Sequence, residues 1–274
     1  MKLILKINIL IIYLGYPYQT LATNAQSSLI GDFGLSIMNF SYKEFKENGQ
    51  LFNHEQGTLP GVKVGLRKNF KPGFLATTFS YHWNDVKYEG ETQSGLPIET
   101  RTKEKIYAGS LQLGRQTKIT CNSISQFYLG LGYYQWQRDI LPTATKLGLF
   151  ETYQWWYGLL GIKGILSIND KSKLSINFAL TYPLNPTIKV DFNGVFDEKT
   201  FNLAGQRGKT FSLAWQYQYN EAMNIIIEPY LEHWPFETSA KQALFRGGKR
   251  VGSVFEPRSK MHNYGLMIYL KRSF

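Results

Sequence analysis

The last twelve residues of the chain, Asn263–Phe274 (NYGLMIYLKRSF), decide the fold. The apolar residues of one alternating series are Tyr264, Leu266, Ile268 and Leu270. The residues between them are a mixture of polar and apolar types. A period of two with one apolar and one mixed face predicts a β-strand, because successive side chains of a strand point to opposite sides. This strand runs to an aromatic residue, Phe274.

The same segment resembles the C-terminal signal of bacterial outer-membrane β-barrel proteins. That signal has a polar residue, a glycine and two spaced hydrophobic residues before a final aromatic residue. The matching residues here are Asn263, Gly265, Ile268, Leu270 and Phe274. The resemblance implies insertion into the cell outer membrane by the barrel-assembly machinery.

The amino-terminal segment has the pattern of a cleaved secretory signal peptide. Two lysines precede an apolar core, Ile7–Gly15, which is too short to span a bilayer as a mature helix. Ala22 and Ala25 each offer a small residue at a cleavage position, and cleavage after Ala25 is favoured. We therefore expect residues 1–25 to be removed from an exported protein.

Composition narrows the class of protein further. The 274 residues include 18 Tyr, 18 Phe and 25 Gly, and the mean hydropathy of −0.27 is too low for a bundle of membrane helices. A membrane β-barrel has such an ordinary composition, because only alternate residues face lipid. The single cysteine, Cys121, excludes an intrachain disulfide framework and a multi-cysteine metal site.

The charge balance suggests anionic surroundings. Lys and Arg exceed Asp and Glu by 31 to 20, a formal net charge of +11. The basic residues are scattered and no nucleic-acid recognition motif accompanies them, so we expect no nucleic-acid partner. Outer-membrane lipid and the phosphates of lipopolysaccharide are the expected partners, with an anion-favouring lumen or simple solvation of the loops as alternatives.

Residues 26–274 contain ten segments with strand-like alternation, separated by turns that are alternately short and long. The segments are Asp32–Phe45, Gly61–Phe70, Phe74–Tyr88, Arg101–Gln116, Gln126–Ile140, Phe150–Ile168, Leu174–Tyr182, Phe201–Tyr219, Ile225–Trp234 and the terminal strand. We expect long loops at Lys46–Thr58, Glu89–Glu99 and Pro235–Arg258. An even strand number with alternating turn lengths predicts an all-β, ten-stranded antiparallel transmembrane barrel with short periplasmic turns and long extracellular loops.

The polar phase of these strands is expected to line the lumen. Its charged residues predict an ion network that braces a narrow barrel. The members of this network are Lys63, Arg67, Lys163, Glu228, Glu232 and Lys271. A soluble exported barrel with its apolar face inward is the alternative, but it leaves the signal peptide and the terminal Phe274 without a common explanation.

The ten strands and the chain length resemble those of the omptin outer-membrane proteases. The final hairpin is also similar, with a Glu-bearing strand followed by Asn263-Tyr264 and a terminal Phe274. Omptins use a pair of aspartates and an Asp–His couple to activate water. The spacings Asp-x-Asp and Asp-x-His do not occur in this sequence, and Asp85 and Glu232 are wrongly spaced substitutes. The resemblance therefore implies architecture and not protease activity.

Two pairs of residues offer hydrolytic chemistry as an alternative. Ser80 and His82 are two residues apart on one strand face, the spacing of a nucleophile and its base. Glu228 and Glu232 could act as acid and base. A hydrogen-bonded lumen histidine and a structural ion network are the preferred interpretations, so no catalytic residue, metal or cofactor is expected.

One loop concentrates positive charge and is expected to be extracellular. Arg246, Lys249 and Arg250 flank two glycines there, and they could bind phosphates of lipopolysaccharide or another acidic ligand. The sequence thus predicts a non-enzymatic integral outer-membrane protein: a narrow, porin-like channel or a surface-binding or structural protein. An outer-membrane hydrolase acting on lipid or peptide is the alternative.

Overall fold

The computed structural model describes residues 28–274 apart from 93–94 and 145, so the predicted signal peptide lies outside the described residues. Ten long strands form the barrel. They are β1 (Leu29–Phe45), β2 (Leu51–Asn69), β3 (Gly73–Glu91), β4 (Pro97–Lys118), β5 (Ser123–Ile140), β6 (Leu149–Ser167), β7 (Ser172–Asp191), β9 (Gly208–Gln218), β10 (Met223–Phe236) and β13 (Arg258–Ser273). Within the described residues, no helix is long and apolar enough to span a membrane.

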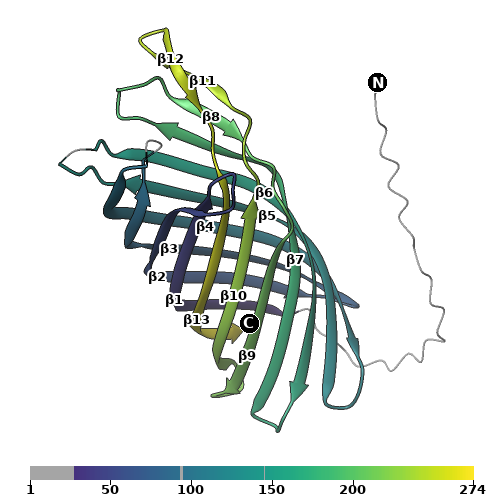
Figure 1. The fold of residues 1–274 in the computed structure, drawn as a ribbon. Helices are drawn as coiled ribbons and strands as arrows, with labels where there is room; N and C mark the ends of the chain where they lie inside the picture. Colours follow the sequence, from purple (N-terminus) through teal and green to yellow (C-terminus); the bar gives the residue numbers. More distant parts are fainter. Residues whose placement is uncertain (1–27, 93–94, 145) are drawn as a thin grey trace, which may run out of the picture.

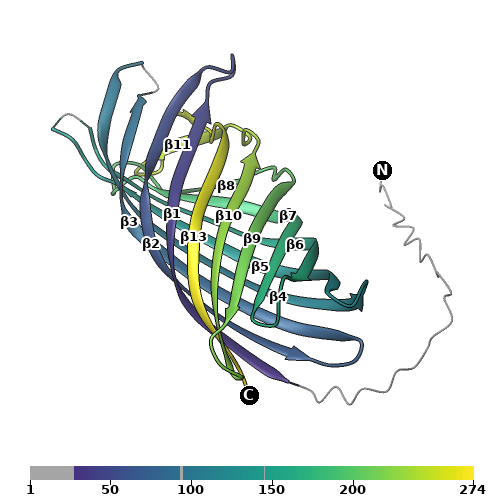
Figure 2. The same ribbon diagram turned by 90° about the horizontal axis from the view of Figure 1, so that it is seen from below.

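The strands close into a barrel through antiparallel pairs. Each strand pairs with its neighbours along the chain, and the first strand, β1, pairs with the last, β13, from Ile30↔Ser273 to Phe45↔Arg258. Figures 1 and 2 show the closed wall from the side and from below. Closure satisfies the backbone hydrogen-bonding groups of every barrel strand, a requirement for any sheet that spans lipid. The predicted ten-stranded antiparallel barrel is confirmed.

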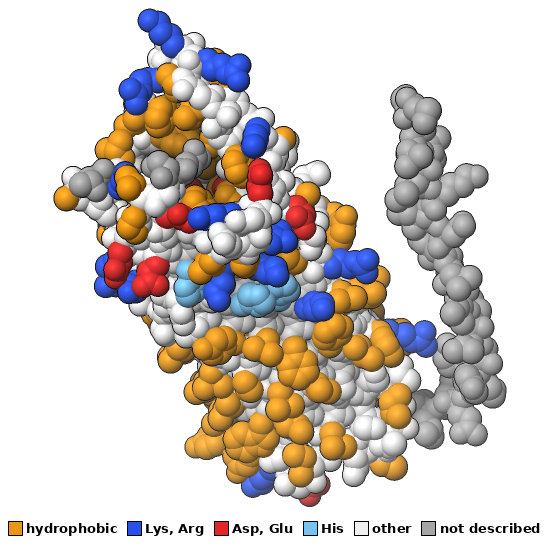
Figure 3. All heavy atoms as spheres, in the orientation of Figure 1, with side chains coloured by type: hydrophobic (Ala, Val, Ile, Leu, Met, Phe, Trp, Pro, Cys, Tyr) orange, Lys and Arg blue, Asp and Glu red, His pale blue; other side chains and the backbone are white. Residues whose placement is uncertain are grey.

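A broad apolar band covers the outside of the barrel at the end with the short turns (Figure 3). The terminal strand contributes the alternating exposed residues Tyr264, Leu266, Ile268 and Leu270, as its sequence predicts. At the upper margin of the band, Tyr133 packs against Trp156, and Tyr81 stacks on Trp83 with ring centroids 4.9 Å apart. Aromatic side chains in this position form the interface girdle of membrane barrels.

The barrel extends well beyond this band on the side of the long loops. Strands of up to 22 residues, as in β4, exceed the roughly 9–11 residues needed to cross a bilayer. Beyond Trp83 on β3, the next outward positions are Asp85, Lys87 and Glu89. Charged outward residues on a continuing strand show that this part of the barrel lies in water above the outer leaflet.

The predicted loop at Lys46–Thr58 is wrong over most of its length. Only residues 46–50 form a turn, and β2 begins at Leu51. Glu55 pairs with Tyr42 of β1 in the continuing ladder. The segment looks like a loop in the sequence because it lies above the membrane, where its outward face meets water and its inward face holds a carboxylate. Apolar alternation disappears there although backbone pairing continues.

Two other boundaries also differ from the prediction. The segment Phe201–Tyr219 is interrupted: the short strand β8 (Lys199–Asn202) pairs with the upper part of β7, and β9 pairs with the lower part. The loop Pro235–Arg258 contains a hairpin of β11 (Gln242–Arg246) and β12 (Lys249–Val254). Gly247 and Gly248 have φ of 55° and 77° at its turn, the left-handed conformations that tight hairpins require.

The close approach of neighbouring strands gives a first prediction. A Cβ atom at Gly130 of β5 would lie 2.2 Å from the carbonyl oxygen of Leu111 on β4, whereas a Cβ at Gly158 of β6 would meet nothing within 4 Å. We expect Gly130→Ala to lower the free energy of unfolding by about 1–3 kcal/mol, because the backbone must shift. Gly158→Ala should change it by less than about 0.5 kcal/mol. Urea unfolding in lipid vesicles measures both, and equal effects would contradict the steric argument.

Candidate functional site

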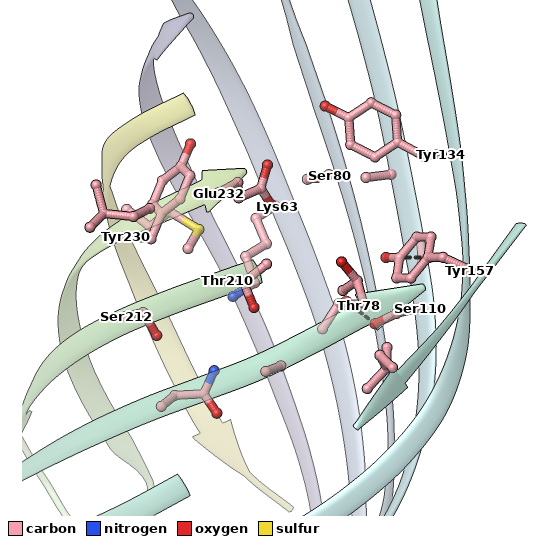
Figure 4. Close-up of a pocket in the computed structure, with 18 of the residues that line it drawn as sticks. Lys63, Thr78, Ser80, Ser110, Tyr134, Tyr157, Thr210, Ser212, Tyr230 and Glu232 are labelled. Carbon is pink, nitrogen blue, oxygen red and sulfur yellow. Dashed lines mark hydrogen bonds between the residues drawn. The ribbon is translucent and has the colours of Figure 1, made fainter. Parts of the chain in front are cut away.

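A polar cavity of about 220 Å³ lies inside the barrel at the level of the membrane band (Figure 4). Side chains from several strands point into it, among them Lys63, Ser80 and Glu232. Two of its buried atoms, His82 Nδ1 and Thr181 Oγ1, have no hydrogen-bond partner among the described residues. Polar voids of this kind are suited to ordered water, and the volume matches roughly seven water molecules.

The predicted lumen network is divided among three levels. Lys63, Lys163 and Glu228 interact electrostatically near the middle of the barrel, and Tyr269 donates a 2.6 Å hydrogen bond to Glu228. Glu232 lies higher, beside Tyr134.

The other two basic residues of the predicted network lie closer to the periplasmic end. Lys271 interacts electrostatically with Arg67, Lys163 and Asp32. The Arg67 guanidinium lies 3.7 Å from the Phe74 ring centroid and donates a 3.3 Å hydrogen bond to Gln126. Asp32 belongs to this group although the prediction did not include it.

The two proposed hydrolytic pairs also face this interior. His82 Nε2 lies 2.9 Å from the hydroxyl of Ser36, so the hydrogen bond of the histidine is with Ser36 and not with Ser80. Glu228 is engaged by Tyr269, and Glu232 is separated from it by the side chain of Tyr230, which also lines the cavity. Among the described residues, no group of three or more His, Cys, Asp and Glu side chains could hold a metal ion.

A layer of aromatic side chains lies above this cavity. Trp136 stands at its centre: its ring centroid is 4.8 Å from that of Tyr42, 5.6 Å from Phe40 and 4.5 Å from Tyr153. All members are at most 2% exposed and come from β1, β5, β6 and β10. This aromatic layer consists of Phe40, Tyr42, Trp136, Tyr153, Trp155 and Phe236.

The aromatic layer separates the lumen from a second cavity at the extracellular mouth. Along β5, the inward residues pass from Tyr134 in the lumen cavity, through Trp136 in the layer, to Arg138 in the mouth cavity. Along β1, Met38 lines the lumen cavity, Phe40 and Tyr42 belong to the layer, and Glu44 lines the mouth cavity. The two cavities share no lining residue, and no member of the layer lines either of them.

The mouth cavity has a volume of about 670 Å³ and a clear division of polarity. Its floor holds Arg138 with Glu44, Glu151 and Glu256, and its rim carries the ion pair of Lys46 with Glu91. Its walls are mainly apolar and include Phe52, Ile98, Ile140, Leu149, Phe192 and Phe201. An apolar cavity with a few convergent polar groups is the usual form of a small-molecule site.

The Arg138 guanidinium donates hydrogen bonds to several neighbouring side chains. Its Nε and Nη2 donate to the two carboxylate oxygens of Glu55, at 3.2 and 2.9 Å. Its Nη1 donates to Glu151 at 2.6 Å, with Glu44 at 3.5 Å and the Tyr153 hydroxyl at 3.2 Å. Arg138 is 1% exposed. Four of its five N–H groups therefore have acceptors within the protein, and the remaining Nη2 hydrogen belongs to a side chain that is almost completely buried.

The carboxyl groups around the mouth cavity outnumber the one buried cation, Arg138. Glu104 accepts a 2.5 Å hydrogen bond from the Trp136 indole, and Glu256 accepts bonds from Tyr153 at 2.6 Å and Tyr42 at 3.2 Å. Glu151 Oε1 and Glu256 Oε2 have no hydrogen-bond partner among the described residues, although both side chains line the cavity. The floor therefore offers free acceptors, which suit a ligand that donates hydrogen bonds.

Burial changes the protonation of these acids. Desolvation raises the pKa of Glu151 to about 7, and the Arg138 charge opposes this shift without cancelling it. Desolvation also raises the pKa of Glu256 well above its usual range, and the nearby charges of Glu44 and Glu151 add to the effect. Perturbed acids that line a cavity mark a candidate functional site.

The sequence did not reveal this site, although one signal was present. Arg138 shares the inward phase of its strand with Tyr134 and Trp136, and a charge in line with large aromatics suggests a filled interior. Glu151 is opposite Arg138 in the pairing of β5 with β6, whereas Glu44 and Glu55 come from β1 and β2, so only the closed barrel brings those two to Arg138.

The predicted anionic-ligand loop lies apart from the mouth cavity. Arg246 is on the hairpin of β11 and β12, where its guanidinium lies 4.9 Å from the Phe196 ring and its Nε donates to the carbonyl of Val195. Lys249 and Arg250 are exposed. The phosphate-binding role of this loop stays a prediction.

The residues of the terminal signal occupy distinct positions on the barrel. Asn263 is buried, and the Tyr230 hydroxyl would lie 2.8 Å from a Cβ at Gly265. Ile268, Leu270 and Phe274 are on the exposed outer side. Their role in assembly stays a prediction.

The buried ion cluster gives a second prediction. Arg138→Met leaves Glu44, Glu55 and Glu151 without their cation in a desolvated site, and we expect a loss of about 3 kcal/mol or more in the free energy of unfolding. Arg101→Met is the matched control, because Arg101 is exposed and lies 3.7 Å from Asp85; the expected change is below about 1 kcal/mol. Urea unfolding in lipid vesicles compares them. Equal midpoints for Arg138→Met and the parent protein would show that the cluster is dispensable.

Comparison with known proteins supports the architecture. No protein-family model and no curated protein sequence matches this chain. The structure is similar to the outer-membrane protease OmpT from Escherichia coli, with a TM-score of 0.62 and 10% sequence identity over 90% of this chain and 97% of that one.

Two other outer-membrane structures are more distantly similar. The translocator domain of the autotransporter NalP from Neisseria meningitidis has a TM-score of 0.45 and 8% identity, covering 92% of this chain and 90% of that one. OprG from Pseudomonas aeruginosa has a TM-score of 0.40 and 11% identity, covering 90% and 96%. The closed ten-stranded sheet and the similarity to OmpT show that the chain has the fold of the outer-membrane β-barrel proteins, in the ten-stranded omptin-like architecture.

Proposed function

We propose that this protein is a non-conducting outer-membrane binding protein, and that its extracellular mouth cavity takes a ligand with an apolar body and an amine group. The observation that supports this most directly is the aromatic layer. It separates the mouth cavity from the lumen, so the cavity opens toward the outside of the cell only. A barrel closed in this way is suited to binding and not to passage.

The chemistry of the cavity supports the ligand class. Apolar walls bind an aliphatic or aromatic body, and the floor presents unused acceptors on Glu151 and Glu256 next to a buried arginine that is paired with three glutamates. A primary ammonium group donates three hydrogen bonds, and its positive charge would offset the excess of acidic groups over the one arginine. An anionic headgroup would find at most one unused N–H on the buried Arg138 and would lie next to the acidic side chains of Glu44, Glu151 and Glu256.

Hydrolysis is not supported in the same way. Ser80, His82, Glu228 and Glu232 lie below the aromatic layer, so a substrate arriving at the cell surface does not reach them. Lipid, lipopolysaccharide and the barrel-assembly machinery remain proposed partners of the barrel wall, and export by a cleaved signal peptide remains part of the proposal.

The closed lumen gives a third prediction. Planar-bilayer recordings of the purified protein should show no stable ion conductance. Trp136→Ala/Tyr153→Ala removes two large side chains from the layer and should produce measurable current, provided that the variant still shows folded, heat-modifiable migration on gels. Trp156→Ala is the control, because Trp156 is 59% exposed on the outside of the barrel. This variant should show no ion conductance. A stable conductance in the parent protein would contradict the proposal.

The floor acids give a fourth prediction, tested in nanodiscs with dansylcadaverine, which combines an aromatic body with a primary amine. Saturable fluorescence enhancement is expected, and Glu151→Gln/Glu256→Gln should weaken affinity by roughly tenfold or more, since each lost charged hydrogen bond costs about 1.5–3 kcal/mol. The exposed pair Glu89→Gln/Glu99→Gln is the control. A dansyl amide that lacks the primary amine should bind the parent protein weakly. Its affinity should be no higher than the affinity of the double variant for dansylcadaverine.

The same experiment has a defined pH dependence. The pKa of Glu151 in the folded protein is about 7, above its ordinary value of 4.5. Between about pH 4.5 and pH 7 the Glu151 carboxyl group of the empty site is therefore protonated. Amine affinity should therefore rise as pH increases through about 7. The contribution of this proton to folding stability has the opposite pH dependence. It is fully present below about pH 4.5 and is lost as pH rises through about 7. Probe affinity that does not change between roughly pH 5 and pH 8 would show that Glu151 does not face the amine.

A further inference from the structure

A row of basic side chains lies on the outer wall immediately above the apolar band. These residues come from the adjacent strands β1, β13, β10 and β9 and all point outward. Figure 3 shows histidines, lysines and arginines gathered along this margin. We name this set the basic face: Lys43, Lys209, His233, Lys260 and His262.

The strand register places these residues as direct neighbours. Lys43 is opposite Lys260, His233 is opposite both His262 and Lys209, and the two histidine rings stack with centroids 4.1 Å apart. Like charges directly opposite each other on paired strands are destabilising. The sheet therefore concentrates positive charge that the protein itself does not offset.

Carboxylates do not neutralise the basic face. Among the described residues, no Asp or Glu lies within 4.0 Å of its lysines or histidines. Lys260 contacts the Phe45 ring at 5.6 Å, which supplies no net charge. Glu44, the neighbour of Lys43 in sequence, points into the barrel and is engaged by Asn53 at 2.7 Å and Arg138.

The opposite wall shows the contrast. On β3, β4 and β5, the outward cations above the band are paired with acids, apart from Lys105 of β4, for which no acid lies within 4.0 Å among the described residues. Lys87 lies 2.5 Å from Glu89 and 2.9 Å from Glu99, Arg101 lies 3.7 Å from Asp85, and Lys103 lies 3.8 Å from Asp139. Unpaired positive charge is therefore concentrated on the basic face, where it comes from neighbouring strands, whereas the described part of the opposite wall has one such lysine.

The height of the basic face identifies its surroundings. Tyr264 is the last apolar outward residue of β13, and His262 and Lys260 are the next two outward positions. At about 3.3 Å per residue and a tilt near 40°, they lie roughly 5 and 10 Å above Tyr264 along the membrane normal. The headgroup region adds roughly 5–7 Å to each side of the hydrocarbon core. His262, His233 and Lys209 are therefore at the level of the lipid phosphates. Lys43 and Lys260 lie one pair of residues higher, from where their long side chains reach down to the phosphates.

We propose that the basic face binds the phosphate groups of anionic lipid in the outer leaflet, as lipopolysaccharide presents them. Lipid bound here would neutralise the opposed Lys43 and Lys260 and would fix one side of the barrel against the membrane surface. This site is distinct from the exposed loop of Arg246, Lys249 and Arg250, which stands farther from the bilayer on the hairpin of β11 and β12 (Figure 1).

The test compares lipid selectivity at the two walls. The parent protein is reconstituted in phosphatidylcholine bilayers containing spin-labelled phosphatidic acid or spin-labelled phosphatidylcholine, and electron paramagnetic resonance measures the motionally restricted fraction of each label. Lys43→Gln/Lys209→Gln/Lys260→Gln is compared with Lys87→Gln/Arg101→Gln/Lys103→Gln, which removes the same charge from the paired wall. Because a phosphate contact is worth about 1 kcal/mol per lysine, selectivity for phosphatidic acid should fall by roughly threefold or more in the first variant and by clearly less in the second.

Three results would overturn the proposal. The first is a parent protein without preference for phosphatidic acid. The second is an equal loss in both triple variants, which would reflect net charge alone. The third is loss of selectivity on adding millimolar inorganic phosphate, which would identify a soluble anion as the occupant. If the first triple variant does not fold, Lys43→Gln/Lys260→Gln against Lys87→Gln/Lys103→Gln makes the same comparison.

Discussion

The structure depends on one constraint: a sheet that crosses lipid must pair all of its backbone hydrogen-bonding groups. The pairing of β1 with β13 meets this requirement by closing the ladder. Once the ladder is closed, the two-residue period of each strand decides which side chains meet lipid and which fill the interior. The apolar band, the lumen and the position of every charge follow from this alternation.

The interior is filled differently at different heights. At the level of the membrane, polar groups such as Lys63, Glu228 and Tyr269 surround a small cavity. Above it, the aromatic layer packs across the barrel from four strands. This layer also excludes water from the lower side of Arg138, whose guanidinium lies 4.5 Å from the Tyr42 ring and 5.1 Å from the Trp136 ring. The low exposure of Glu151 and Glu256, and so the raised pKa of each, depends on this packing.

Charge is separated across the barrel wall above the membrane. The inner side of the mouth has more carboxylates than cations, whereas the outer side of β1, β13, β10 and β9 carries unpaired lysines and histidines. Glu44 and Lys43 illustrate the separation, because they are adjacent in sequence and lie on opposite sides of one strand. A ligand in the mouth and a lipid at the wall would therefore meet opposite charges.

The sequence by itself determined the strand order, the membrane-facing side and the even strand number, because alternation is a local property that lipid exposure keeps regular. It failed at Lys46–Thr58 and Pro235–Arg258, where both faces of the chain leave lipid and the apolar signal disappears. Only the tertiary structure decided the functional surfaces. Arg138 meets Glu44, Glu55 and Glu151 across sequence separations of 94, 83 and 13 residues, and Lys43 meets Lys260 at the closing pair of strands. These contacts depend on register and closure, which no local pattern of residues encodes.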